Sequence, residues 1–82
     1  MTVMETYRCL ADALKKRLEV IQDAKLRETN PSLQLEQLKA VSEEISRLQK
    51  ELPQDCDPHL KHYLQNCSFD KALAFLGKTY DL

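Results

Sequence analysis

The chain has 82 residues and a net charge of −1, with 43% hydrophobic and 30% charged residues. A chain of this length forms at most one domain with a small core. Such a core argues against a self-contained enzyme with a deep cleft. The near-neutral charge argues against binding of nucleic acid or an anionic membrane. Fourteen leucines stand beside only nine valines, isoleucines and threonines, and there is one glycine, so the composition favours an all-α fold.

The first predicted helix covers about residues 2–28. Thr2 and Glu5 have the spacing of a capping box, in which two side chains satisfy exposed backbone N–H groups. Apolar residues then recur at steps of three and four, which places them on one face of a helix. These residues are Val3, Tyr7, Leu10, Leu14, Leu18 and Ile21. Asn30 and Pro31 mark a break, since they suit the cap and the first turn of a second helix.

The second predicted helix covers about residues 31–52. Its apolar residues repeat with the heptad period of a coiled coil, and Leu35 widens the beginning of the seam. The seam consists of Leu38, Val41, Ile45, Leu48 and Leu52. Because the connection to the first helix is short, the two helices are expected to form an antiparallel hairpin over residues 2–52.

Two short helices are predicted to follow, at about 58–66 and 69–77. Asp57 before Pro58 repeats the cap-then-proline signal, and Ser68 is the expected cap of the last helix. Gly77 stands where a left-handed helix terminator is expected, which leaves residues 78–82 as a flexible tail. The pair over residues 57–77 is expected to cover the hairpin as a lid, so that residues 1–82 form a single domain.

The amphipathic stripes of the two long helices are longer than the lid that covers them. Each long helix spans about 30 Å and each short helix about 13–15 Å, at a rise of 1.5 Å per residue. An uncovered apolar stripe usually marks a contact with a partner or with a second copy. The predicted interface residues are Leu14, Leu18, Leu35, Leu38 and Val41. The expected function is a protein-protein interaction module, as a subunit or adaptor of a cytosolic assembly, with homodimerisation as one form of it.

Two cysteines and two histidines form the most chemically suggestive group in the sequence. Cys56, His59, His62 and Cys67 give the pattern C-x2-H-x2-H-x4-C, and zinc in structural sites takes four such ligands. The spacing differs from the usual pairing of C-x2-C with H-x3-5-H, and surface histidines with small, partly buried thiols give the same pattern. A small structural zinc module is therefore the alternative function, whereas no metal or cofactor is expected in the main one.

Other functional classes find little support in the residues. There is no nucleophile turn, phosphate-binding loop or H-E-x-x-H motif, so no enzymatic activity and no small-molecule substrate is expected. The basic run Lys15-Lys16-Arg17 lies near Glu19 and has no interleaved aromatic residues, which is typical of a solvated helix face. Without a signal peptide or a membrane span, the three cysteines are expected to be reduced in the cytoplasm or nucleus.

Two segments resemble parts of known helical families. Leu14 to Leu52 resembles the hairpin of Rho-effector HR1 domains, since Ile45, Leu48 and Leu52 follow the end of its second-helix pattern. Cys67 to Leu76, CSFDKALAFL, is similar to the last helix of ubiquitin-binding UBA-like modules. A Rho-type GTPase or ubiquitin would be the partner by likeness alone, and no site residue is carried over.

Overall fold

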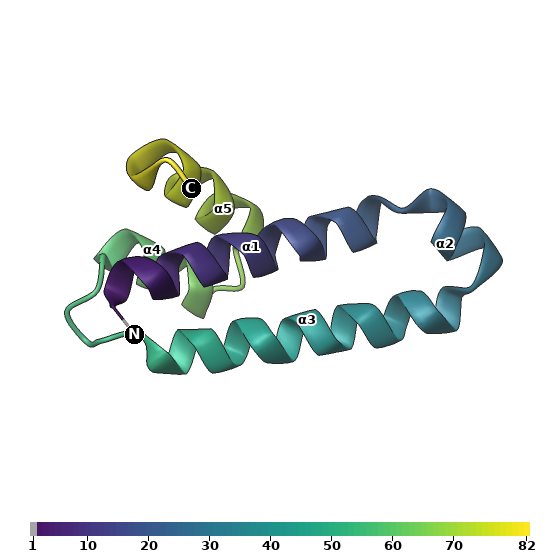
Figure 1. Ribbon diagram of the computed structural model, residues 1–82, viewed down its shortest axis with the longest axis horizontal. Helices are drawn as coiled ribbons and strands as arrows, with labels where there is room; N and C mark the ends of the chain where they lie inside the picture. The colour runs from purple at the N-terminus through teal and green to yellow at the C-terminus, as the bar shows by residue number, and fades with distance from the viewer. Residues whose placement is uncertain (1) are drawn as a thin grey trace.

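The computed structural model of the chain describes residues 2–82, of which 83% are helical, with no strand among them. Two long helices pack antiparallel, and two short C-terminal helices follow them (Figure 1), which confirms the predicted all-α hairpin. The molecule measures 43 × 22 × 22 Å. Its helices are α1 (Val3–Gln22), α2 (Ala24–Thr29), α3 (Pro31–Glu51), α4 (Pro58–Gln65) and α5 (Phe69–Tyr80). None of the described helices has the length and apolar character needed to cross a membrane.

Three of the predicted helix caps are present. Thr2 Oγ1 accepts a hydrogen bond from the N–H of Glu5 at 3.2 Å, and this bond starts α1. Asn30 starts α3 and Asp57 starts α4 in the same way, each with a proline in the first turn that follows. Ser68 occupies the cap position of α5 but makes no side-chain hydrogen bond there. Short polar side chains thus set three of the helix starts.

The first long helix is interrupted at Asp23, where a continuous helix to residue 28 was predicted. Asp23 has φ −76° and ψ 87°, and its Oδ1 accepts a hydrogen bond from the N–H of Leu26 at 2.9 Å. An aspartate can cap a new helix as readily as it can continue an old one, because its side chain competes for backbone N–H groups. The Arg27 guanidinium also donates to the Ile21 carbonyl at 2.6 Å. The chain therefore bends at Asp23 and begins α2.

The last helix runs three residues beyond its predicted end. Gly77 lies inside α5, and the left-handed residue is Asp81, with φ 57° and ψ 41°. Residues 78–80 therefore belong to a helix, so the predicted flexible tail is wrong for this part. The physical reason is packing, because the Tyr80 ring lies 5.0 Å from the Tyr7 ring of α1, between centroids. Leu82 is held as well, since its main-chain oxygen accepts a hydrogen bond from Lys15 Nζ at 2.7 Å.

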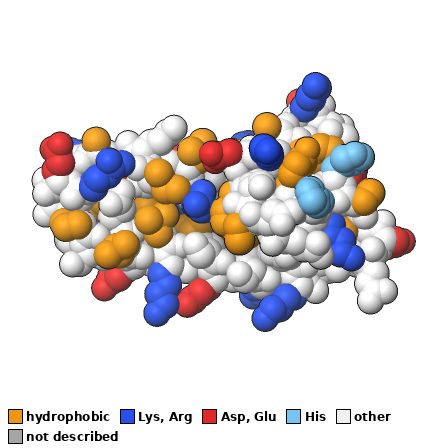
Figure 2. Space-filling model, turned by 180° about the vertical axis from the view of Figure 1, so that it is seen from behind, with side chains coloured by type: hydrophobic (Ala, Val, Ile, Leu, Met, Phe, Trp, Pro, Cys, Tyr) orange, Lys and Arg blue, Asp and Glu red, His pale blue; other side chains and the backbone are white. Residues whose placement is uncertain are grey.

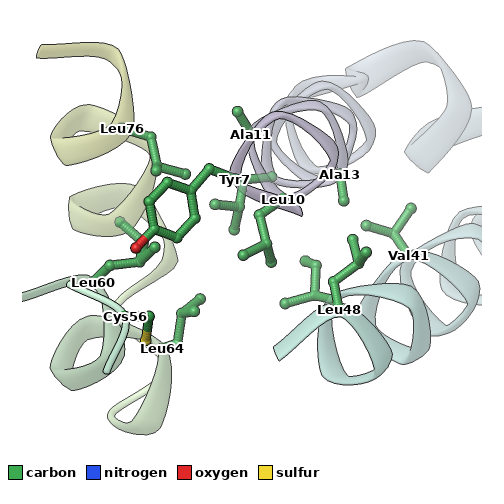
Figure 3. Close-up of a cluster of buried hydrophobic side chains, with 13 residues drawn as sticks. Tyr7, Leu10, Ala11, Ala13, Val41, Leu48, Cys56, Leu60, Leu64 and Leu76 are labelled. Carbon is green, nitrogen blue, oxygen red and sulfur yellow. The ribbon is translucent and has the colours of Figure 1, made fainter. Parts of the chain in front are cut away.

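The buried core lies in one half of the hairpin. Leu10 of α1 is fully buried, and the surrounding core side chains come from α3, α4 and α5 (Figure 3). We call this the covered half, and it comprises residues 3–17 and 41–51 together with α4 and α5. Its core consists of Tyr7, Leu10, Ala11, Ala13, Leu14, Val41, Ile45, Leu48, Cys56, Leu60, Leu64, Ala72 and Leu76.

The other half of the hairpin has no lid. We call it the open half, and it comprises residues 18–22, α2 and residues 31–40. α2 packs on α3 at the end of the molecule away from α4 and α5 (Figure 1). Among the described residues of this half, only Val20 and Gln34 are buried. The lid therefore covers about half of the hairpin, as its helix lengths predict.

Candidate functional site

The five predicted interface residues occupy three different environments. Leu14 and Val41 are 2% and 3% exposed and belong to the core of the covered half. Leu18 and Leu38 are half-buried in the open half. Leu35 is 67% exposed, the largest value among the exposed large hydrophobic side chains. The structure therefore separates the set into a core pair and a partly uncovered group.

The uncovered group continues the core stripe of the two long helices. Leu18 lies four residues after Leu14 on α1, and Leu38 lies three residues before Val41 on α3. Such steps keep side chains on one helical face. Ile21 follows Leu18 by three residues and is half-buried too. We call Leu18, Ile21, Leu35 and Leu38 the open stripe; orange side chains gather over this end of the molecule in Figure 2.

The edge of the lid marks where the open stripe begins. Phe69, the first residue of α5, lies against Arg17, whose guanidinium carbon is 4.7 Å from the ring centroid. Arg17 precedes Leu18, so this cation-π contact closes the covered half one residue before the stripe. From this point α1 and α3 continue without cover from α4 or α5.

The open half is held together by a buried side-chain amide. Gln34 is 8% exposed, and its Nε2 donates a hydrogen bond to the Val20 carbonyl at 3.0 Å. This bond joins α3 to α1 across the hairpin at the level of the open stripe. Buried polar groups are stable only when they are hydrogen-bonded, so this contact fixes how the two helices face each other. Sequence reasoning missed Gln34, although it lies four residues before Leu38 in the same seam.

A second polar contact fastens the lid to the hairpin. The Tyr80 hydroxyl donates to Asp57 Oδ2 at 2.8 Å, and the N–H of Asp57 donates to the Tyr7 hydroxyl at 2.9 Å. These bonds connect α5, the loop before α4, and α1. We call this arrangement the tyrosine clasp. Sequence reasoning missed it, although Tyr80 follows Leu76 by four residues and so continues the apolar face of α5.

The clasp changes the ionisation of both of its acidic groups. Burial alone would raise the pKa of Asp57, but hydrogen bonds from Tyr80 and His59 outweigh burial and lower it below the ordinary value of 3.8. The hydrogen bond to Asp57, followed by burial and by the negative charge of Asp57, raises the pKa of Tyr80 to about 12. The clasp is thus stable with Asp57 charged and Tyr80 neutral.

The cysteines and histidines of the predicted zinc group do not share a centre. Cys56 is 7% exposed and belongs to the core, whereas His59, His62 and Cys67 are exposed. Cys67 has φ 55° and directly follows Asn66, the cap residue of α4, and its N–H donates a hydrogen bond to the Leu64 carbonyl at 3.1 Å. Within residues 2–82, no three His, Cys, Asp or Glu side chains are placed to hold a metal ion. The observed geometry gives no support to the zinc alternative.

The hydrogen bonds of the two histidines are local. The N–H and Nδ1 of His59 lie 2.9 and 3.3 Å from Asp57 Oδ1. His62 lies beside the Asn66 amide one turn along the chain. Both rings therefore belong to the surface of α4.

Comparison of the sequence with protein-family models, and of the chain with curated proteins and with solved structures, gives no match.

Proposed function

We propose that this chain is a non-enzymatic protein-interaction module that binds another protein through the open stripe, as a subunit or adaptor of a cytosolic assembly. The observation that carries the proposal is the exposure of Leu35, 67%, at the end of a stripe whose other end is the core. Leu14 and Val41, which belonged to the predicted interface, contribute to folding in this proposal. The binding residues are Leu18, Ile21, Leu35 and Leu38.

The arrangement of these side chains favours a binding role over incidental exposure. Single exposed hydrophobic residues are common on protein surfaces, whereas a contiguous apolar patch marks a contact. Here four aliphatic side chains lie on the neighbouring stretches of two helices that the Gln34 bond joins. Complete burial of one such side chain contributes about 1.5–3 kcal/mol. A partner that covers the stripe therefore gains affinity without a rearrangement of the hairpin.

An amphipathic helix is the partner element that suits this surface. Two antiparallel helices offer a shallow seam into which a third helix packs ridges into grooves, as α5 packs on α1 in the covered half. In this arrangement α1, α3 and the partner's helix pack together over the open stripe. A second copy of the chain can supply this helix too, which makes self-association one form of the same function.

The test compares one charge on the stripe with the same charge on the opposite side of α3. Leu35→Asp introduces a carboxylate at the exposed stripe position, and Ala40→Asp introduces it at another exposed position of the same helix, away from the seam. Sedimentation velocity over a range of concentrations measures self-association. Crosslinking in cells, followed by quantitative mass spectrometry, measures binding of other proteins.

We expect Leu35→Asp to abolish association and to leave the helical circular dichroism unchanged, while Ala40→Asp changes neither. Equal loss of association in both variants would contradict the proposal, because the charge itself would then be responsible. A Leu35→Asp chain that has lost its helices would show that the residue supports the fold instead of an interface. Wild-type chain with no associated protein in either measurement would also contradict it.

A further inference from the structure

A separate groove lies between the end of α3 and α4, on the covered half. Its volume is about 360 Å³, within the range of sites that bind ligands. α3 contributes one wall, through Ser46, Gln49 and Lys50, and α4 contributes the other, through Lys61 and Gln65. The groove shares no residue with the open stripe, so an inference about it stands or falls independently of the proposed function.

The floor of the groove is apolar. It is made by the side chains of Leu52, Cys56 and Leu64. Leu64 and Cys56 are 2% and 7% exposed and also belong to the hydrophobic core, which fixes their positions. Leu52 is half-buried against the same core. A bulky apolar side chain therefore has a rigid surface on which to pack.

The walls of the groove carry positive charge. Lys50 and Lys61 stand on opposite walls, are both exposed, and have no carboxylate within 4.0 Å among the described residues. No aspartate or glutamate lines the groove. The nearby Glu51 carboxylate is engaged by Arg47 at 3.2 Å. Three glutamines, Gln49, Gln54 and Gln65, supply amide donors and acceptors around the lysines.

A shallow hollow extends the groove along α3. It shares Ser46 and Lys50 with the groove and reaches Lys39, with Glu43 as the one acid in its lining. Lys39 also has no carboxylate within 4.0 Å among the described residues. Lys50 lies eleven positions after Lys39 on the same helix, which corresponds to about 16 Å at a rise of 1.5 Å per residue. An extended peptide of about five residues covers that distance.

We propose that this groove binds a short acidic segment of a partner protein. One bulky apolar side chain of the segment packs on the floor formed by Leu52, Cys56 and Leu64. Carboxylates that flank it lie between Lys50 and Lys61 and reach toward Lys39. The glutamine side chains hydrogen-bond the peptide backbone of the segment. Two lysines from two different helices, which line a groove with an apolar floor and no acidic residue, match this chemistry in both charge and polarity.

The experiment uses a phage-displayed library of random twelve-residue peptides, selected on the full chain. We expect the selected peptides to combine Asp or Glu with a bulky apolar residue. Their affinities are then measured by fluorescence anisotropy for wild type, for the double variant Lys50→Glu/Lys61→Glu, and for the matched control Lys16→Glu/Lys71→Glu. The control makes the same charge change at exposed lysines outside the groove.

The groove variant should bind the selected peptides at least about tenfold more weakly than wild type, since like charges then face the carboxylates. The control variant and Leu35→Asp should bind as wild type does, and higher salt should weaken the wild-type interaction. Amide signals of Gln49, Gln54 and Gln65 should shift on titration in heteronuclear NMR spectra.

Several outcomes would overturn the proposal. They are the absence of selected peptides, the selection of peptides without acidic residues, and equal binding by the groove and control variants. NMR shifts confined to the open stripe would assign the peptides to that surface instead. Decanoate serves as a probe for small anionic amphiphiles, and shifts at the groove with decanoate but with no peptide would assign it to such ligands. A chain that dimerises through the groove, detected as a dimer lost in the double variant, would likewise overturn it.

Discussion

The covered half and the open half of the hairpin are built from the same two helices, α1 and α3. The apolar side chains of these helices are more deeply buried in the covered half than in the open half. In the covered half α4 and α5 add a second layer, and side chains such as Leu10 and Ile45 are 0% and 1% exposed. In the open half the same apolar stripe continues, but Leu18 and Leu38 are half-buried and Leu35 is 67% exposed. The number of helices around the stripe, and not its composition, sets this difference.

The residues that stabilise the fold and the residues proposed to bind a partner lie in different halves of the hairpin. A small domain buries a smaller fraction of its surface on folding than a large one does, so its core is small. In this chain the core residues are concentrated under the lid. The open half relies on one buried amide and on the partial packing of aliphatic side chains. Elements with few buried contacts open more readily, which leaves them available to partners.

The largest effect is expected from a charge in the covered half. Ile45→Asp places a carboxylate among apolar side chains at a position that is 1% exposed. The cost of burying a carboxyl group there, added to the lost packing of Ile45, is comparable with the total stability of a small domain, about 5–15 kcal/mol. We therefore expect the helical circular dichroism to be lost. Ala40→Asp is the control, and an Ile45→Asp chain that still unfolds cooperatively would place the core elsewhere.

A direct comparison of the halves uses truncation of one leucine in each. Leu60, in the lid, is 0% exposed, and Leu60→Ala should lower the free energy of unfolding by about 2–5 kcal/mol. Leu38 is half-buried in the open half, so Leu38→Ala should cost about 1 kcal/mol. Chemical denaturation monitored by circular dichroism measures both. Equal losses would show that the open half is as well packed as the covered half.

The tyrosine clasp predicts a dependence of stability on pH at both extremes. The raised pKa of Tyr80 means that its contribution is complete below about pH 10 and is lost as the pH rises toward 12. The lowered pKa of Asp57 means that its contribution is present above pH 3.8 and is lost as the pH falls further.

Tyr80→Phe tests this dependence, because it removes the hydroxyl while keeping the ring on Tyr7. We expect a loss of about 1.5 kcal/mol at neutral pH, since the hydrogen bond is to a charged group. The fall in stability between pH 10 and 12 should become smaller in the variant. Thermal unfolding at stepped pH values provides the measurement, and identical alkaline profiles for the two chains would show that the clasp does not hold the lid.

The smallest of these effects should be local to the open half. Gln34→Ala removes the hydrogen bond to the Val20 carbonyl, which should cost about 1 kcal/mol. Hydrogen exchange should become faster in α2 and in the adjoining turns of α1 and α3. The same measurement should find the covered half unchanged. Faster exchange throughout the chain would mean that the two halves open together and are not separate in stability.

Much of the fold was predictable from local signals. Thr2, Asn30 and Asp57 were identified as caps from their position before helical patterns, and each accepts the expected backbone hydrogen bond. The break at Asp23 was missed because a capping aspartate and an ordinary surface aspartate look alike in a sequence without glycine or proline nearby. The end of α5 was misplaced because Gly77 matched a terminator pattern, while Tyr80 gains its contact from a residue 73 positions earlier, Tyr7.

The candidate site was predicted only in part. The length of the stripe and the shortness of the lid indicated that some leucines stay uncovered, and Leu35, Leu18 and Leu38 are among them. The sequence did not separate these residues from Leu14 and Val41, which have the same spacing and the same residue types. The groove between α3 and α4 gave no sequence signal either, since Lys50 and Lys61 lie on different helices.

The sequence by itself determined where α1, α3, α4 and α5 begin and the order in which they follow one another, because helix starts depend on periodicity and on caps within a few residues. The tertiary structure alone decided which part of the stripe becomes core and which stays open. It also brought Tyr7, Asp57 and Tyr80 together, and it placed Lys50 and Lys61 in the lining of one groove. Such outcomes depend on where the lid docks, and docking is a sum of contacts between residues far apart in the chain, which no local pattern encodes.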